Sequence, residues 1–370
     1  MRKLEKMHRR SFIKKGTGVV VGAAAASAYV APAVAQKKID MVIVSAWPRD
    51  FPGLGISAQR HAKRITELTE GRINVTYFAA GERVGAFDTF DAVASGNAQA
   101  HNTADYYWKG KHPGWAYFCA VPFGLTYTEM DAWIKYAGGQ QLWDELGDKY
   151  GLKCFAAGNT GEQMGGWFNK EINSANDFKG LKMRIPGLGG DVLSKLGASP
   201  VSLPGGQIYE NLVSGAIDAT EWVGPYNDYF MKFYEAAKFY YYPGFHEPGS
   251  QISFGMNKSW WGKLSKTDQA IIQASCNEEN ARQMAETNAN NGAYLTRLIK
   301  DHGIKLKKFN DETFDAFGKA SQQVFDETRQ HSALAAKIHD SFAKARDDIG
   351  RWSGLADAAF VSQRNRVLKL

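Results

Sequence analysis

Cysteine is scarce in this sequence of 370 residues, which has only Cys119, Cys154 and Cys276. Their odd number and wide spacing exclude a framework of several disulfides, and they form no CxxC motif. We expect free, buried thiols that pack as small apolar residues. In an oxidising compartment, one disulfide is the alternative.

Motifs typical of several enzyme classes are also missing. The sequence has no GxSxG and no HExxH motif. A Gly53-x-Gly55-x-x-Ala58 pattern follows a predicted strand, but seven residues separate the two and include Pro48 and Pro52. No acidic residue ends the second predicted strand, so a dinucleotide site is not expected. An exported enzyme is therefore the weaker alternative for this chain.

Long apolar stretches are confined to the N-terminus. Residues 2–15 are basic and include Arg9-Arg10, and the Ala- and Gly-rich stretch 16–35 ends in Ala33-Val34-Ala35. Twin arginines, an apolar stretch and a small-x-small cleavage site are typical of a removable export signal. We expect residues 1–35 to direct export to the periplasm by the twin-arginine pathway. An uncleaved membrane anchor is the alternative, because the stretch is long enough to span.

A marked excess of charge is absent once this segment is set aside. The chain has 45 Lys and Arg residues against 38 Asp and Glu residues. Residues 1–35 hold seven of the basic and one of the acidic residues, which leaves 38 against 37. A nearly neutral chain has no basic footprint for nucleic acid, so no nucleic-acid partner is expected.

Strands and helices alternate through the first 220 residues. Strands are predicted at 38–45, 73–78, 152–157, 181–185, 200–202 and 215–221. Helices are predicted at 55–69, 87–95, 128–149, 190–196 and 207–213. This alternation predicts an α/β fold in two units, the first with a largely parallel sheet. The chain beyond residue 35 is long enough for two domains.

The last third of the sequence is dominated by helices. A helix is predicted from Ser265, which resembles an N-cap, to Gly303. At ~1.5 Å per residue it would exceed about 50 Å, so we expect it to cross both domains. A second helix at 333–352 places five apolar residues on one face: Leu334, Ile338, Phe342, Ala345 and Ile349. This face is expected to pack within the chain, with a homodimer contact as the alternative.

Four blocks, 159–168, 178–187, 214–222 and 241–248, carry a resemblance to a known family. They resemble the DctP-type periplasmic substrate-binding subunits of tripartite ATP-independent periplasmic (TRAP) transporters. The resemblance is closest to the subgroup that binds 2-oxo acids and 2-hydroxy acids. Other members often have an acid-Asn-Pro sequence where this chain has Glu221-Trp222-Val223-Gly224-Pro225. That departure favours this subgroup over binders of C4-dicarboxylates or sialic acid.

The resemblance implies a two-lobed periplasmic-binding-protein fold with a cleft between the lobes. Strands cross between the lobes, and the long helix spans them. Residues 36–160 with about 250–290 would form lobe I, and residues 161–249 with about 291–330 lobe II. Residues 331–370 would form a C-terminal helical segment. A ligand that contacts both lobes would close the cleft around itself.

Arg184 is the predicted anchor for a carboxylate. It stands near the end of a predicted strand and before Pro186, and open α/β sheets bind ligands at the carboxyl ends of their strands. A guanidinium group matches a carboxylate with two parallel hydrogen bonds. The resemblance independently assigns Arg184 to the ligand carboxylate.

The resemblance also implies a metal ion, Na⁺ or Ca²⁺, that bridges the protein and the ligand carboxylate. Its predicted ligands are the Gln163 side-chain oxygen, the Glu221 carboxylate and the Trp222 carbonyl, with Glu247 as a weaker candidate. Such hard cations prefer oxygen ligands. Gln163, Trp222 and Glu247 are also expected to contact the acid. Three further residues are predicted to line its pocket: Asn102, Tyr106 and Phe123.

These observations predict a binding protein and not an enzyme. It would capture a pyruvate-like 2-oxo acid or a lactate-like 2-hydroxy acid and deliver it to the integral membrane subunits of a TRAP transporter. The alternative role, with the same ligand site, is presentation of the acid to a sensor kinase.

Overall fold

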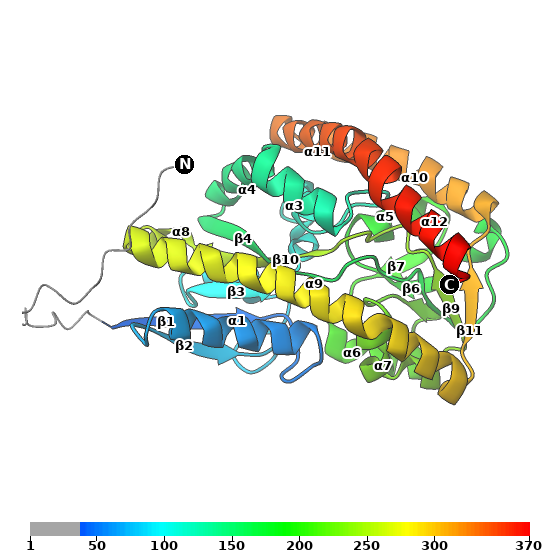
Figure 1. The fold of residues 1–370 in the computed structure, drawn as a ribbon, viewed down its shortest axis with the longest axis horizontal. Helices are drawn as coiled ribbons and strands as arrows, with labels where there is room; N and C mark the ends of the chain where they lie inside the picture. Colours follow the sequence, from blue (N-terminus) through cyan, green and yellow to red (C-terminus); the bar gives the residue numbers. More distant parts are fainter. Residues whose placement is uncertain (1–37) are drawn as a thin grey trace, which may run out of the picture. The chain divides into compact units, whose positions relative to one another are not determined.

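Two β-sheets organise residues 38–370, the part of the chain that the computed structural model describes (Figure 1). The predicted export signal, residues 1–35, lies outside the described residues. The first sheet has the strand order β2-β1-β3-β10-β4, and the second has the order β11-β9-β5-β8-β6-β7. Helices pack on both sheets, so the α/β fold class is confirmed.

The first sheet is built largely from the N-terminal half of the chain. Its strands are β1 (Ile39–Ser45), β2 (Ile73–Phe78), β3 (Ala100–Thr103), β4 (Leu152–Asn159) and β10 (Gln251–Asn257). The strands β2, β1 and β3 are parallel, whereas β10 is antiparallel to both β3 and β4. Apolar residues of β1 such as Met41 and Ile43 are fully buried. The sheet is therefore mixed, because a strand that arrives late in the sequence enters it between β3 and β4.

The second sheet is also mixed. Its strands are β5 (Gly166–Phe168), β6 (Lys182–Arg184), β7 (Ser199–Val201), β8 (Ala219–Thr220), β9 (Phe239–Tyr242) and β11 (Lys305–Lys308). The strands β8, β6 and β7 are parallel, and β5 runs antiparallel to β8 and β9. The strand predicted at 215–221 is shorter than expected. Its first residues turn back on the preceding helix, where the Ile217 N–H donates to the Asn211 carbonyl at 3.2 Å.

Short helices accompany each sheet. Around the first are α1 (Leu54–Leu68), α2 (Thr89–Ala94), η1 (Asp105–Trp108), η2 (Pro113–Phe118), α3 (Tyr127–Tyr136), α4 (Gly139–Asp148) and α8 (Lys258–Trp261). Around the second are η3 (Ala175–Phe178), α5 (Gly187–Lys195), α6 (Gly205–Val213), α7 (Pro225–Met231) and η4 (Phe233–Glu235). The single helix predicted at 128–149 is wrong. Gly138, with φ of 90°, adopts a left-handed conformation that ends α3 and starts α4.

Two chain segments cross between the sheets and lie against each other. Residues 160–165 lead from β4 to β5, and residues 243–250 lead from β9 to β10. The Thr160 N–H donates to the Ser250 carbonyl at 3.1 Å, and the Gln163 N–H donates to the Glu247 carbonyl at 3.1 Å. These crossing segments therefore place two of the predicted site residues between the sheets.

The long helix α9 (Lys266–His302) confirms the helix predicted from Ser265 to Gly303. The Ser265 hydroxyl accepts the Asp268 N–H at 3.0 Å, as an N-cap does. The helix packs on α1 and β4 of the first sheet and on α7 of the second, and it passes over both in Figure 1. This one element ties the two sheets together, as its length predicts.

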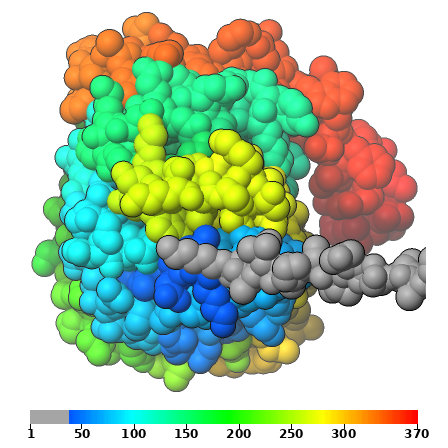
Figure 2. Space-filling view, turned by 90° about the vertical axis from the view of Figure 1, so that its left-hand side faces the viewer, coloured from blue at the N-terminus to red at the C-terminus, as the bar shows by residue number. Residues whose placement is uncertain are grey.

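The C-terminal helices are α10 (Asp311–Gln330), α11 (Ala333–Ser353), the π-helical turn η5 (Gly354–Ala358) and α12 (Ala359–Leu368). The apolar face predicted on α11 packs within the chain, where Phe342 meets the rings of Tyr117 and Trp133 edge-on at 5.2 and 5.1 Å. Within residues 38–370, nothing buries the side chains of the segment after η5, which are almost all exposed. In Figure 2 its end, drawn in red, stands apart from the rest of the described residues.

All three cysteines are free and buried, as expected from their spacing. Among residues 38–370, no helix has both the length and the apolar character that crossing a membrane requires.

Candidate functional site

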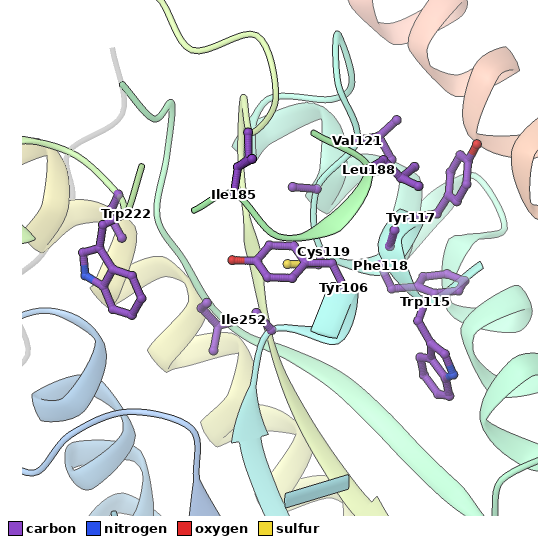
Figure 3. Close-up of a cluster of buried hydrophobic side chains, with 14 of the residues drawn as sticks. Tyr106, Trp115, Tyr117, Phe118, Cys119, Val121, Ile185, Leu188, Trp222 and Ile252 are labelled. Atoms are coloured by element: carbon purple, nitrogen blue, oxygen red, sulfur yellow. The ribbon is translucent and has the colours of Figure 1, made fainter. Parts of the chain in front are cut away.

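A small cavity of about 10 Å³ lies between the two sheets. Its lining comes from the first sheet and its helices, from the crossing segments, and from the loop after β8: Trp47, Leu54, Tyr106, Tyr107, Thr160, Gln163, Trp222, Val223, Ser250 and Ile252. In Figure 3 the Tyr106 hydroxyl points toward the space that Trp222 and Ile252 border. Elements distant in sequence therefore meet around one small space.

Arg184 and Glu221 lie beside this cavity at the carboxyl ends of β6 and β8. Because these strands are parallel neighbours, their ends meet at one sheet edge. The Arg184 Nη1 group donates to a Glu221 carboxylate oxygen and, at 3.2 Å, to the Glu221 carbonyl. Its Nε group donates to the Leu203 carbonyl at 3.1 Å. The guanidinium is fully buried, and its Nη2 group has no hydrogen-bond partner among residues 38–370.

Gln163 and Glu247 come from the two crossing segments. The Gln163 Nε2 group donates to a Glu247 carboxylate oxygen at 2.8 Å and to the Ser250 hydroxyl at 3.0 Å. The Gln163 Oε1 atom is buried and has no hydrogen-bond partner in the part of the chain that the structure describes. The amide thus uses its donors to hold the crossing segments together and keeps its acceptor oxygen free.

A buried cluster of charge surrounds these residues. Glu221, His246 and Glu247 offer potential ligand atoms that lie within 4.8 Å of one another, and all three side chains are buried. Burial, reinforced by Glu221, raises the pKa of Glu247 to about 7. Burial lowers the pKa of His246, but the Glu221 carboxylate outweighs it, so the net shift is upward. Both groups therefore hold a proton more readily than usual, which indicates that the cluster favours an added positive charge.

Four buried polar atoms around the site have no hydrogen-bond partner in the described structure: Gln163 Oε1, Arg184 Nη2, Trp222 Nε1 and His246 Nδ1. Such atoms are rare in folded proteins, because leaving one unpaired costs about 1–3 kcal/mol. Free donors suit an anion, and a free amide oxygen beside carboxylates suits a hard cation. The residues present therefore fit a carboxylate together with a Na⁺ or Ca²⁺ ion.

Trp222 separates the charged cluster from the apolar part of the cavity. Its ring lies 5.2 Å from the Arg184 guanidinium carbon and meets the rings of Trp47 and Phe51 edge-on, each at 6.2 Å. A β-carbon added at Gly205 would lie 2.4 Å from the Trp222 Cη2 atom. The indole is thus held between α6 and aromatic rings of the first sheet.

The structure places the other predicted residues differently. Tyr106 lines the cavity, and burial raises the pKa of its hydroxyl well above the usual range. Asn102 lies behind the wall, where its Oδ1 atom accepts the Trp47 Nε1–H at 2.7 Å. Phe123 does not reach the cavity. Its ring packs against Phe245 and Phe314, 6.4 and 5.3 Å between centroids.

Sequence reasoning gave no binding role to several residues that the structure brings to the site, among them Trp47, Leu54, Thr160, Val223, Ser250, Ile252 and His246. Thr160 and His246 stand inside the resemblance blocks, so those blocks held the signal for them. Trp47 and Leu54 lie more than 100 residues earlier in the chain. No local sequence pattern connects them with Arg184. They come near it only because the two sheets pack against each other.

Comparison with known proteins places the chain among solute-binding proteins. Residues 45–331 match the model of the bacterial extracellular solute-binding proteins, family 7. A relative from Nostoc sp. (strain PCC 7120) is named a monocarboxylate 2-oxoacid-binding periplasmic protein. It is 41% identical over 318 residues, which cover 86% of this chain and 87% of that protein.

Solved structures show the same fold. A TRAP transporter solute-binding protein from Bordetella bronchiseptica RB50, a dimer with calcium and picolinate in one of its sites, is 35% identical. Its TM-score is 0.88, and the match covers 90% of this chain and 99% of that one. A TRAP periplasmic solute-binding protein from Pseudoalteromonas atlantica T6c, with bound sodium and pyruvate, is 36% identical. Its TM-score is 0.85, with coverage of 88% and 99%. The chain therefore belongs to the family 7 bacterial extracellular solute-binding proteins and has the fold of the TRAP periplasmic binding subunits.

Proposed function

We propose that the chain binds a small monocarboxylic 2-oxo acid such as pyruvate, or the corresponding 2-hydroxy acid, together with a Na⁺ or Ca²⁺ ion. The observation that carries this is the fully buried Arg184 guanidinium beside the cavity, whose Nη2 group has no hydrogen-bond partner within the described residues. A donor of fixed charge in that position suits one carboxylate. The names of the relatives agree with an acid of this class.

The metal would be held by oxygens of both crossing segments and of the loop after β8. Gln163 Oε1, the Glu221 carboxylate and the Trp222 carbonyl are the proposed ligands, with Glu247 as a further one. When bound, the ion offsets the repulsion between Glu221 and the carboxylate of the acid. Arg184 orients that carboxylate, and Trp222 keeps water from the carbon chain. The bound acid is released unchanged, so the chain carries out no reaction.

The two sheets act in this proposal as two lobes that close over the acid. The lobes follow the division expected from the sequence, 36–160 with about 250–290 and 161–249 with about 291–330. The crossing segments, which touch both lobes and carry Gln163 and Glu247, serve as the hinge. The closed, loaded chain then docks on the integral membrane subunits of a TRAP transporter. Export to the periplasm by the twin-arginine pathway precedes this step.

A second copy of the chain is the proposed partner of the C-terminal segment, residues 331–370. The last helices expose several large apolar side chains: Trp352, Leu355, Phe360, Val367 and Leu368. The Bordetella protein is described as a dimer. A Phe360→Glu variant would then shift the mass measured by light scattering from two chains to one. A variant that keeps the mass of two chains would contradict this segment as the contact, and a wild-type mass of one chain would contradict the dimer.

Thermal unfolding of the purified, ligand-free chain tests the binding proposal. At 100 times the dissociation constant a ligand adds ~2.7 kcal/mol to the free energy of unfolding, which for domains of this size raises Tm by roughly 5–10 °C. We expect such a shift for short 2-oxo or 2-hydroxy acids with Ca²⁺ or Na⁺, and a smaller one with chelator. A shift for a nucleotide or a sugar, and for no acid, would contradict the proposal.

A further inference from the structure

We propose that Trp47 sets the upper limit on the length of the carbon chain that the cavity accepts. This inference rests on the proposed function, because it concerns the same cavity. Trp47 follows β1 in the first sheet, far in sequence from the charged cluster, and its side chain is 2% exposed.

The lining of the cavity divides into a polar and an apolar part. Thr160, Gln163 and Ser250 bring polar groups from the crossing segments, whereas Trp47, Leu54 and Ile252 bring apolar ones from the first sheet and α1. The carboxylate and oxo groups of an acid need the polar part, so its alkyl end faces the apolar part. At about 10 Å³ the cavity is far below the ~300–1,000 Å³ typical of ligand pockets, so an acid must push its lining apart, and the least movable part of that lining limits the size of the acid.

Among these three apolar residues, Trp47 has the least freedom to move. Its Nε1 group donates to the Asn102 Oδ1 atom at 2.7 Å, and this bond is buried. Its backbone is held as well, because its carbonyl accepts the Ala80 N–H at 2.9 Å and its N–H donates to the Ser45 hydroxyl at 3.2 Å. Rotating the indole would leave the buried Asn102 acceptor without a partner, which is costly.

The rings around Trp47 block its remaining movements. Trp222, from the second sheet, meets it edge-on at 6.2 Å and 79°, and Tyr107 lies at 6.4 Å and 53°. Leu54, by contrast, is an aliphatic side chain in the first turn of α1 with no hydrogen bond to fix it. A longer acid can displace a leucine by a rotamer change, but it meets a fixed wall at Trp47.

Each methylene group added to the acid therefore meets the Trp47 ring. One methylene in an apolar pocket changes affinity by ~10–200-fold. We expect pyruvate to bind most tightly, and 2-oxobutanoate and 2-oxopentanoate to bind successively more weakly. Replacing the indole by a smaller side chain opens space next to the alkyl end and reduces this discrimination.

The test is isothermal titration calorimetry with these three acids and Ca²⁺. Wild type, Trp47→Leu and Trp261→Leu are compared. Trp261 is a matched control, since its ring packs on Phe155, 5.4 Å between centroids, and does not line the cavity. We expect the ratio of pyruvate to 2-oxopentanoate affinity to fall at least tenfold in Trp47→Leu and to stay unchanged in Trp261→Leu. If circular dichroism shows that Trp47→Leu is unfolded, Trp47→Phe, which also removes part of the ring, takes its place with the same expectation.

An unchanged ratio in a folded Trp47 variant would overturn this inference and leave the proposed function intact. Equal affinity of the wild type for all three acids would overturn it in the same way. If the wild type bound none of the three acids, the proposed function itself would fail, and this inference with it.

Discussion

The second-sheet side of the cavity carries charge, whereas the first-sheet side carries aromatic and aliphatic groups. Arg184 and Glu221 stand at neighbouring strand ends on the charged side, and Trp47 and Leu54 stand on the apolar side. Charged groups buried this deeply need partners, and Arg184 Nη2 has none in the described structure. The two sides therefore have different roles: the charged side fixes the head group of a ligand, and the rigid apolar side limits the size of the ligand.

The two sides also differ in how they are held. The charged side depends on hydrogen bonds between residues close to one another in the strand-end loops and crossing segments. The apolar side depends on rings from both sheets meeting edge-on, as Trp47 and Trp222 do. Four substitutions test this division, and they are ordered by the size of their expected effect on ligand affinity.

The largest effect is expected for Arg184→Ala on the charged side. Truncating one partner of a buried charge pair costs about 2–5 kcal/mol, which lowers affinity for pyruvate roughly 30- to 5,000-fold. Calorimetry measures this loss, and Arg184→Lys should not restore it, because an ammonium group lacks the planar fork. Arg49→Ala, which removes an exposed arginine that pairs with Glu82 and contacts Tyr77 outside the cavity, is the control. Near-wild-type binding by Arg184→Ala would contradict the assigned anchor.

Glu221→Gln should have the next largest effect, and the effect should concern the metal. The substitution keeps an oxygen atom but removes a charge that a hard cation favours. We expect Ca²⁺ affinity to fall about tenfold or more, which corresponds to ~1.4 kcal/mol. Titration of Ca²⁺ in the presence of excess pyruvate measures it, with Glu235→Gln, whose carboxylate bonds only to Tyr209 among the described residues, as control. Equal calcium dependence in the two variants would remove Glu221 from the metal site.

Gly205→Ala tests the boundary between the two sides. Its new β-carbon would lie 2.4 Å from the Trp222 Cη2 atom, so the indole must shift. Overpacking of this kind costs about 1–3 kcal/mol, and we expect pyruvate affinity to fall by about tenfold. The adjacent Gly206 is the matched control, since a β-carbon there meets nothing within 4 Å. Equal affinities of the Gly205→Ala and Gly206→Ala variants would show that the position of Trp222 does not matter for binding.

Asp105→Asn, beneath the apolar side, should leave affinity unchanged and alter only the pH dependence of stability. Burial raises the pKa of Asp105 from 3.8 to about 7. The folded chain therefore keeps a proton that the unfolded chain has released, and stability falls as pH rises between about 4 and 7. In the wild type the free energy of unfolding should fall by ~1.4 kcal/mol per pH unit over this pH range, and the variant should not show this fall. Urea unfolding at pH 4.5, 6 and 8 measures it, and parallel pH profiles for variant and wild type would contradict the assignment.

Sequence alone predicted the charged side better than the apolar side. Arg184 and Glu221 could be predicted because both stand at the carboxyl ends of short strands, and residues at the ends of parallel strands converge. Trp47 was not, because its place in the cavity depends on contacts between the sheets. The break at Gly138 was missed because an apolar pattern continues through it, and Phe123 was placed in the pocket although its ring packs on Phe245 and Phe314. Local periodicity carries no information on such long-range packing.

The most direct test of the account compares pyruvate with pyruvamide, which replaces the carboxylate by an uncharged amide of nearly the same shape. Calorimetry of the purified chain with each compound, in Ca²⁺ and in chelator, separates head-group charge from size. The account predicts that pyruvate binds with Ca²⁺, that chelator weakens this binding at least tenfold, and that pyruvamide does not bind measurably. Equal binding of the two compounds, or pyruvate binding that is the same in chelator, would contradict it.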